Sequence, residues 1–387
     1  MSDVKIGSIR LDFAWAPCRW PRWLALLGCL VAVGVPNAAT AAADPRTDAT
    51  NKGVVELETA GASGNSLRIA EDLAALIDDG ATRRVLPVVG RTALQNLWDL
   101  VLLRGIDMAV LQTDVVDSVR QNRSLPAIDT AFTYITKLYN EEFHLLAGPD
   151  VKTVADLANK RVGIGVRGAG SGVTAERLFG LLKIPVEPVE DRPQVAIDKL
   201  RHGQLAAVAV VAGKPSSLLQ ELPPGEGWHF IPIPLEANVV NAYVPATLNA
   251  TDYPALIAAG RSVDTVAVGS LLAVARLQPG SERYRNVANF VDVFFTQFRS
   301  LLEPGHDPKW AEMNLATDLP GLVRFAPAQL WLDRNAAVAK QNPQDVKALF
   351  SRFLDSRQQV LEGPSVSDQQ KQELFNEFQR WQAGQSR

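Results

Sequence analysis

The feature that most constrains the fold of this chain is a repeated order of apolar strand, short polar turn and helix. Residues 54–59, 85–89 and 108–111 are strand-like runs, and each leads through a polar turn into a segment with helical periodicity. Helices between successive strands require crossover connections, which predict an α/β fold with a parallel sheet. Right-handed crossovers bring the three turns to the carboxyl edge of the strands, where open α/β sheets bind ligands.

The three turns carry polar side chains that could bind a small ligand at this edge. The candidate ligand-binding residues there are Ser63, Asn65, Ser66, Arg91, Thr92, Gln112 and Thr113. Arg91 would offer a two-pronged donor to a carboxylate, or it could be a solvated surface arginine. Asn65 and Ser66 could equally be helix caps.

A second block of the chain repeats the same order. Strand-like runs at 161–164, 186–189 and 206–212 alternate with helical segments, and extended runs at 132–138, 142–146, 263–268 and 271–275 look like connections between two lobes. We therefore predict crossings near 145–148 and 267–271. The predicted domains are lobe 1 at 54–147 with a return at 267–300, lobe 2 at 148–266, and a C-terminal helical extension at 301–387.

The glycine-rich stretch at 160–182 has three interpretations. It can be an ordinary strand-to-helix turn with Ser171 as the cap of a helix whose periodicity covers 173–182. It can be a dinucleotide fingerprint, because Gly163, Gly165 and Gly168 match G-x-G-x-x-G, although Gly163 falls inside the strand. It can also be a small-anion cradle, since the backbone N–H groups at a helix start favour a carboxylate or phosphate. The rest of the chain favours the anion cradle.

If the cradle is real, the second lobe supplies further candidates. A rival guanidinium is Arg167, and Tyr139 at a crossing could stack on a ligand or pack the hinge. The candidate residues from this part of the chain are Tyr139, Arg167, Gly170, Ser171, Gly172, Val173, Thr174, Lys214 and Ser216.

The first 43 residues are typical of an export signal or an N-terminal anchor. Arg19 and Arg22 precede an apolar run at 23–35, which is short for a membrane span, and small residues that suit cleavage follow it. Both cysteines, Cys18 and Cys29, lie in this segment, so a cleaved product has no thiol nucleophile. The net charge of −3 and the lack of a basic patch argue against nucleic acid as a partner.

Several motifs of the chain together carry a family resemblance. The most telling one is the segment at 154–162 that leads into the glycine/serine turn at 168–172. Further motifs are the turn at 60–64, Leu138-Tyr139, and His144-Leu145-Leu146, and the pattern extends over about residues 54–300. In these motifs the chain resembles the TAXI solute-binding subunits of TRAP transporters. The first turn departs from the family, which usually has a threonine-rich loop and a tyrosine where Ser66 and Leu67 stand, and the second turn at 89–92 departs as well.

The resemblance implies a two-lobed periplasmic binding protein fold of the type II kind. It also implies a periplasmic protein that captures a small carboxylated solute, such as an amino acid or organic acid, for the membrane permease of a TRAP transporter. The altered turns keep open a second possibility, a periplasmic sensor or scaffold protein that has the fold but has lost transport. A dinucleotide-dependent enzyme is the third possibility, and export argues against it because a dissociable cofactor is scarce outside the cytoplasm.

The sequence indicates no enzyme, no cofactor and no metal site. The four histidines are scattered without metal-ligand spacing, and His144 lies in an apolar strand where a hydrogen-bonded core role is expected. Ser171 lacks the nucleophile-elbow pattern. Glu141 and Glu142 are adjacent in an extended segment, so their side chains should point to opposite faces of the sheet.

Overall fold

The sheet at the centre of the fold has ten strands in the computed structural model, which describes residues 45–61, 64–125, 127–223 and 227–335. Its order is β2-β1-β3-β10-β4-β7-β5-β6, with β8 beside β4 and β9 beside β10. The strands are β1 (Val54–Thr59), β2 (Arg84–Val89), β3 (Met108–Gln112), β4 (Phe132–Ala147), β5 (Arg161–Gly163), β6 (Glu187–Val189), β7 (Ala207–Ala212), β8 (His229–Phe230), β9 (Val244–Asn249) and β10 (Ser262–Ala275).

Helices connect and cover these strands. The α-helices are α1 (Pro45–Asn51), α2 (Asn65–Ile77), α3 (Ala93–Leu102), α4 (Thr113–Gln121), α5 (Ile128–Ala131), α6 (Gly170–Leu182), α7 (Pro193–Arg201), α8 (Ser217–Gln220), α9 (Ala237–Val240), α10 (Glu282–Gln297) and α11 (Ala326–Arg334). The 3-10 helices are η1 (Val154–Leu157), η2 (Phe298–Leu302) and η3 (Pro308–Glu312).

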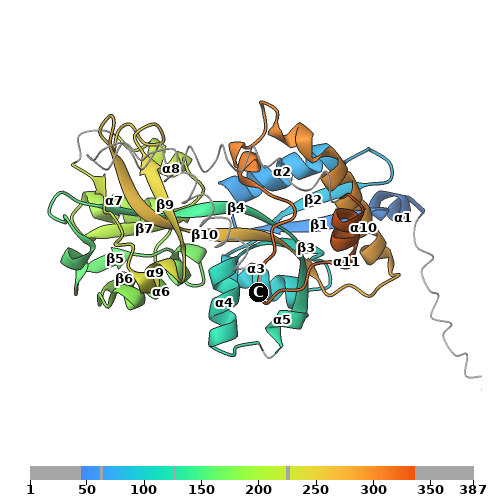
Figure 1. Ribbon diagram of the computed structural model, residues 1–387, viewed down its shortest axis with the longest axis horizontal. Helices are drawn as coiled ribbons and strands as arrows, with labels where there is room; N and C mark the ends of the chain where they lie inside the picture. The colour runs from blue at the N-terminus through green and yellow to red at the C-terminus, as the bar shows by residue number, and fades with distance from the viewer. Residues whose placement is uncertain (1–44, 62–63, 126, 224–226, 336–387) are drawn as a thin grey trace, which may run out of the picture. The chain divides into compact units, whose positions relative to one another are not determined.

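Lobe 1 is built on β1, β2 and β3. Strand β1 pairs in parallel with both β2 and β3, so the predicted parallel sheet is confirmed here. Helices α2 and α10 cover one face of these strands, and α3 and α4 cover the other (Figure 1). The apolar stripe of α2 buries Ile69, Leu73 and Ile77 against this sheet, as its periodicity predicts.

Lobe 2 has the same parallel arrangement. Strand β5 pairs in parallel with β6 and β7, and α6 packs its Ala175 and Leu178 against these strands in a separate core. Helix α7 contributes Ala196 and Leu200 to a second core on the other side. The expected α/β class with two lobes is therefore confirmed.

Two long antiparallel strands, β4 and β10, run through both lobes (Figure 1). In β4, the pairing with lobe-2 strand β7 covers Glu142 to Ala147, so the passage between lobes precedes the residues 145–148 expected from the sequence. The expected pair of shorter runs is one continuous strand, because Asn140 and Glu141 keep the ladder to β10 intact. In β10, pairing changes from β9 to β3 between Ala267 and Ser270.

Residues 301–335, the start of the expected C-terminal extension, belong to the core of lobe 1. Trp310, Phe325 and Leu332 are buried among side chains of α2 and α10, as expected of core aromatic and aliphatic residues. The backbone of Phe325 bonds to the Tyr134 carbonyl of β4 at 2.7 Å, which fixes this segment against the sheet. The rest of the predicted helical extension, residues 336–387, and the predicted signal or anchor at 1–43 lie outside the described residues.

Among the described residues, none of the helices combines the length and the apolar character that crossing a membrane requires.

Candidate functional site

The carboxyl ends of the lobe-1 strands meet the glycine turn of lobe 2. Helix α6 begins at Gly170, three residues before the Val173 start that periodicity predicted, and Ala169 is its N-cap. Gln112, at the end of β3, lies directly against Gly170: a Cβ atom there would be 1.6 Å from Gln112 Oε1. Only glycine permits this approach. A backbone bond from Leu94 N–H to the Gly168 carbonyl, 3.1 Å long, joins the same two lobes.

One set of side chains, the α4–α6 contact, consists of Gln112, Asp114, Glu141, Thr174 and Tyr243. The Thr174 hydroxyl donates to Asp114 Oδ2 at 2.6 Å, and the Tyr243 hydroxyl donates to the same oxygen at 3.2 Å. The Gln112 amide donates to Glu141 Oε2. All five side chains are at least nine-tenths buried. Asp114 of α4 is thus hydrogen-bonded to two residues of lobe 2, and Gln112 of β3 is hydrogen-bonded to the long strand β4, all away from water.

The α4–α6 contact contains acceptors that nothing satisfies. Asp114 Oδ1 and Gln112 Oε1 are buried and have no hydrogen-bond partner among the described residues. Burial raises the pKa of the Asp114 carboxyl and raises the pKa of Glu141 to about 7. The guanidinium of Arg177 on α6 lies 5.4 Å from the centre of the Tyr243 ring and pairs with Asp117 at 3.7 Å. Its charge opposes the effect of burial on the pKa of Asp114, and its buried Nη1 has no hydrogen-bond partner among the described residues. The contact is therefore acidic and incompletely paired.

A second set, the α2–η3 contact, consists of Asn65, Glu142, Asp307, Lys309 and Glu312. The Lys309 ammonium donates to Glu142 Oε1 at 3.0 Å and to Glu312 Oε1 at 2.7 Å. The Asp307 carboxylate accepts from the Asn65 amide at 3.1 Å and from the Lys309 backbone N–H at 2.9 Å. These hydrogen bonds hold η3 and its N-cap Asp307 against Asn65, the first residue of α2.

The α2–η3 contact also reaches lobe 2. The backbone N–H of Lys214, which follows β7, donates to Glu142 Oε2 at 2.8 Å. A Cβ at Gly213 would lie 2.5 Å from Asn65 Oδ1 and 2.9 Å from Lys309 Cε, so the two lobes approach closely here as well. Burial alone would lower the pKa of Lys309, but Glu142 and Glu312 together hold it above its usual range. Lys309 is only 1% exposed and is a fully paired buried charge.

The predicted site residues fall into two groups. Those at a contact between lobes or their turns are Asn65, Thr92, Gln112, Gly170, Val173 and Thr174, with Lys214 contributing its backbone N–H. Val173 packs onto the lobe-1 core formed by α3 and α4. Thr92 also caps α3, with its hydroxyl accepting from Gln95 N–H at 3.2 Å.

The remaining predicted residues have other surroundings. Arg167 is 87% exposed in its side chain and pairs with Glu190 at 3.2 Å. Arg91 is exposed and has no polar contact within the described chain. Ser171 accepts from the Val211 N–H at 2.9 Å and is not the helix cap. Tyr139 is buried, and its hydroxyl donates to Glu141 Oε1 at 3.2 Å, so it does reach the α4–α6 contact. Ser66 is buried, and neither Asn65 nor Ser66 caps α2, because Gly64 is its N-cap. Ser216 donates its N–H to the Tyr253 hydroxyl, Thr113 lies beside Gly269, Gly172 lies against the Ile164 carbonyl, and Ser63 is outside the described residues.

Several residues at the contacts were not expected from the sequence. Asp114 directly follows two residues that were, so its place in the first turn of α4 was a usable signal. Glu141 and Glu142 contact different groups, Gln112 and Lys309 respectively, which agrees with the expected opposite directions of their side chains. Lys309 has a local partner in Glu312, but nothing near it in the chain indicates its bond to Glu142, which is 167 positions away.

Beneath the second turn of lobe 1 lies a buried polar pair, Glu58 and Asn96. A Cβ at Gly90 would be 2.1 Å from Asn96 Oδ1 and 2.6 Å from Glu58 Oε1, so the glycine admits both side chains. Burial, with the neighbouring Asp99 carboxylate, raises the pKa of Glu58 to about 7. Glu58 lies on β1 and Asn96 on α3, both within lobe 1.

The glycines of the dinucleotide pattern have structural explanations. Gly163 lies within β5, and a Cβ there would be 2.9 Å from the Ala196 side chain of α7. The lack of a side chain at Gly163 therefore allows α7 to pack closely against the sheet. Among the described residues, no cluster of histidine, cysteine, aspartate and glutamate could hold a metal ion. His144 is fully buried, bonds to the Tyr253 hydroxyl at 2.7 Å, and has its pKa lowered to about 3 by burial.

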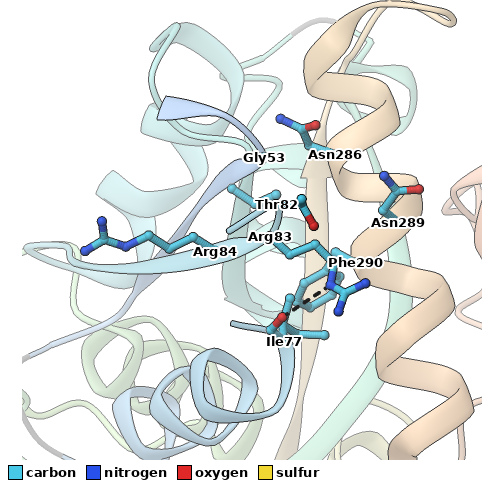
Figure 2. Close-up of a pocket in the computed structure, with 9 residues that line it drawn as sticks. Gly53, Ile77, Thr82, Arg83, Arg84, Asn286, Asn289 and Phe290 are labelled. Carbon is cyan, nitrogen blue, oxygen red and sulfur yellow. Dashed lines mark hydrogen bonds between the residues drawn. The ribbon is translucent and has the colours of Figure 1, made fainter. Parts of the chain in front are cut away.

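A small pocket of about 10 Å³ lies at the other end of lobe 1. Figure 2 shows its lining, which includes Gly53, Ile77, Arg83, Asn286 and Phe290. Arg83 reaches across it to donate to the Ile77 carbonyl at 3.5 Å. It lies at the amino ends of β1 and β2, and none of the predicted ligand-binding residues lines it.

Comparison with known proteins places the chain in a family. Residues 57–290 match the model of the NMT1-like family, and the chain belongs to that family.

The chain is also similar to solved structures. The periplasmic binding protein BugD shares 12% identity over 73% of this chain and 93% of its own, with a TM-score of 0.46. Tv2483, solved with L-arginine, shares 13% sequence identity over 70% of this chain and 96% of its own chain, with a TM-score of 0.43. The alkanesulfonate-binding protein SsuA from Xanthomonas axonopodis pv. citri was solved with MOPS. It shares 16% sequence identity over 79% of this chain and 93% of its own chain, with a TM-score of 0.41.

Proposed function

We propose that this protein is an extracytoplasmic solute-binding protein that captures a small carboxylated solute between its two lobes. The observation that carries the proposal is the position of Gln112 against Gly170. The carboxyl end of β3 in lobe 1 therefore faces the amino end of α6 in lobe 2, and the Gln112 side chain lies directly against Gly170. Ligands of α/β proteins bind at strand ends of this kind, and helix amino ends favour anions.

In this proposal the lobes separate by bending at the segments where β4 and β10 run from one lobe to the other. The solute then enters between Gln112 and Gly170. A solute carboxylate would accept from the free backbone N–H groups at the start of α6. The Ser171 hydroxyl accepts from Val211 and so still has its own hydrogen to donate. Charged hydrogen bonds of this kind contribute about 1.5–3 kcal/mol each. Arg91 and Arg167 lie in solvent, so the backbone groups would have the larger share.

The proposed protein is periplasmic and is not an enzyme. The apolar segment within residues 1–43 would direct export, and it would be cleaved or kept as an anchor. On the resemblance to TAXI subunits, its partner would be the permease of a TRAP-type transporter. Lobe closure would present a new surface to that permease.

A second candidate function is a periplasmic sensor or scaffold protein with the same fold. The observation that favours it is the α2–η3 contact. There the chain's own Asp307 carboxylate bonds to Asn65, one of the residues expected to bind the solute. Lys309 lies beside Gly213 at the second-lobe turn. A chain that fills part of its own contact between lobes could hold a closed form without solute.

Thermal unfolding of the full chain with a panel of amino acids, dicarboxylates and monocarboxylates tests the two candidates. Solute binding predicts a raised melting temperature with at least one carboxylate, because a ligand that binds only the folded state stabilises it. A scaffold predicts no shift with any of them and a stable protein partner in pull-downs. The absence of any shift, together with such a partner, would contradict solute binding.

A further inference from the structure

The amino ends of the lobe-1 strands lie at one edge of the sheet, opposite to the carboxyl edge of the proposed solute site. Strands β1, β2 and β3 are parallel, with Val54 aligned to Arg84. Strand β10 runs the other way and ends here, where the Ala275 N–H donates to the Asp107 carbonyl at 2.9 Å. Arg283, near the start of α10, bonds to the Asp107 carboxylate at 2.5 Å. We call this surface the amino edge, and it consists of residues 52–53, 78–84, 102–107 and 276–285.

Cations gather at the amino edge, although the chain as a whole has a net charge of −3. The exposed ones are Lys52, Arg84, Arg104, Arg276 and Arg285. The exposed carboxylates of the same edge are Asp78, Asp79 and Glu282. Asp79 is paired with the further cation Arg83 at 3.3 Å. The edge is therefore positive, and its cations come from separate segments of the chain, so the sequence shows no basic run.

Two exposed leucines lie at the same edge. Leu102 is the last residue of α3 and is 67% exposed, and Leu103 after it is 53% exposed. The exposed Arg104 follows them directly. Apolar side chains beside cations are typical of surfaces that lie on a lipid bilayer. Nucleic acid would attract the cations through its phosphates but gives the leucines no apolar surroundings.

The sequence before lobe 1 leads to the amino edge as well. Lys52 and Gly53 directly precede β1, and residues 36–51 separate them from the apolar run at 23–35. A segment of that length spans at most about 55 Å when it is fully extended. An apolar run that stays in the membrane as an anchor would therefore keep the amino edge close to the bilayer.

We propose that the amino edge of lobe 1 docks on the surface of a bilayer that contains anionic phospholipids. The lipid phosphates accept hydrogen bonds from the exposed lysine and arginines, and Leu102 and Leu103 enter the boundary between head groups and acyl chains. The carboxyl edge of lobe 1, with the proposed solute site, then faces away from the bilayer. This inference goes beyond the proposed function and does not depend on it.

Hydrogen–deuterium exchange of the full chain in lipid vesicles tests the inference. One set of vesicles is phosphatidylcholine alone, and in the other about one third of the lipid is phosphatidylglycerol, which gives a negative surface potential. Peptides that cover 100–106 and 276–285 should exchange more slowly with phosphatidylglycerol, and peptides of lobe 2 should exchange equally in both. The difference should shrink at about 0.5 M salt, which screens surface charges.

A triple variant of the edge measures the share of the cations. Lys52→Gln, Arg104→Gln and Arg276→Gln together should lower the docking constant about a hundredfold, at about fivefold for each cation, and should remove most of the protection. The matched control removes three exposed lysines of lobe 2 by Lys152→Gln, Lys160→Gln and Lys183→Gln, and it should be protected as the wild type is.

A second variant tests the leucines. Leu102→Ser with Leu103→Ser keeps every charge and should reduce the protection of 100–106. Both side chains are exposed, so the melting temperature in solution should stay close to that of the wild type.

Equal exchange of the amino edge in the two kinds of vesicle would overturn the inference, as would protection that the edge triple variant keeps in full. Protection that appears in native membranes but never in lipid vesicles would also overturn it and would indicate a membrane protein as the partner. None of these outcomes bears on the proposed function, which concerns the opposite edge of lobe 1.

Discussion

The α2–η3 contact and the α4–α6 contact both join the lobes, yet they are built in opposite ways. In the first, Lys309 neutralises Glu142, and Asp307 is bonded to Asn65. In the second, Asp114 and Gln112 keep unpartnered oxygens, and the guanidinium of Arg177 pairs with Asp117 and does not hydrogen-bond to Asp114. Both contacts are buried, so solvent does not account for the difference.

The difference separates a contact that stabilises the fold from one that is suited to a ligand. Buried charges with all their partners are costly to disrupt, whereas unsatisfied buried groups are themselves a cost that a bound ligand can remove. We therefore infer that the α2–η3 contact keeps one side of the space between the lobes closed, and that the solute enters on the other side.

The largest expected effect comes from removing the cation of the α2–η3 contact. Lys309→Met should lower the free energy of unfolding by about 3–5 kcal/mol, because it leaves Glu142 buried without its partner. Urea unfolding followed by circular dichroism measures it. The matched control is Lys199→Met, whose ion pair with Asp191 is partly exposed and should be worth about 0–1 kcal/mol. Equal losses in the two variants would contradict the assigned role of Lys309.

A methyl group at the start of α6 should be the next most disruptive change. Gly170→Ala places a Cβ where the Gln112 side chain now lies, so we expect about 1–3 kcal/mol of lost stability and weaker solute binding. Gly180→Ala, in the same helix with open space around it, should be neutral or stabilising by up to about 1 kcal/mol. Adding Gln112→Ala should restore part of the stability. A Gly170→Ala variant as stable as Gly180→Ala would show that the lobes do not approach closely here.

The buried carboxyl of Glu141 predicts a pH dependence of smaller size. Its pKa is raised to about 7 by burial, above the ordinary value of 4.5, so the folded state favours the protonated form. The stabilisation is complete below pH 4.5 and is lost as the pH rises through 7. We expect the free energy of unfolding to fall by about 1–3 kcal/mol across this range, relative to Glu141→Gln. If the free energies of unfolding of the wild type and of Glu141→Gln changed with pH in parallel, the raised pKa of Glu141 would be contradicted.

The smallest change is expected at Asp114, and it should have the opposite sign to the effect at Lys309. Asp114→Asn removes a buried charge that is not hydrogen-bonded to a cation and keeps an oxygen that can accept from Thr174. We expect stability without solute to be unchanged or raised by about 1 kcal/mol. Thermal unfolding without added solute measures it. A loss as large as that of Lys309→Met would mean that Asp114 is a structural residue of the kind found in the α2–η3 contact.

Much of the fold could be predicted because its signals are local. The order of strand, turn and helix from β1 to α4 follows from the periodicity of apolar residues and from single residues such as Thr92, which caps α3. The start of α6 was misplaced by three residues because Gly170, Ser171 and Gly172 are poor helix formers, and contacts with lobe 1 override that propensity.

The site was predictable only in part, because its partners are distant in sequence. The turn residues Gln112 and Thr174 could be chosen from strand ends and glycine spacing, but their partners Glu141 and Asp114 depend on which lobe faces which. Lys309 lies in a segment expected to be a separate extension, and nothing near it in the chain indicates that its ammonium reaches Glu142. Arginines were the favoured carboxylate ligands by chemistry, yet Arg167 lies in solvent.

The most direct test of solute capture between the lobes is native mass spectrometry of the protein purified gently from cells that export it. The account predicts a bound small molecule with a carboxylate, present on the wild type and on Gly180→Ala and absent from Gly170→Ala. A wild-type protein without any adduct, which also binds no added amino acid or carboxylate, would contradict it.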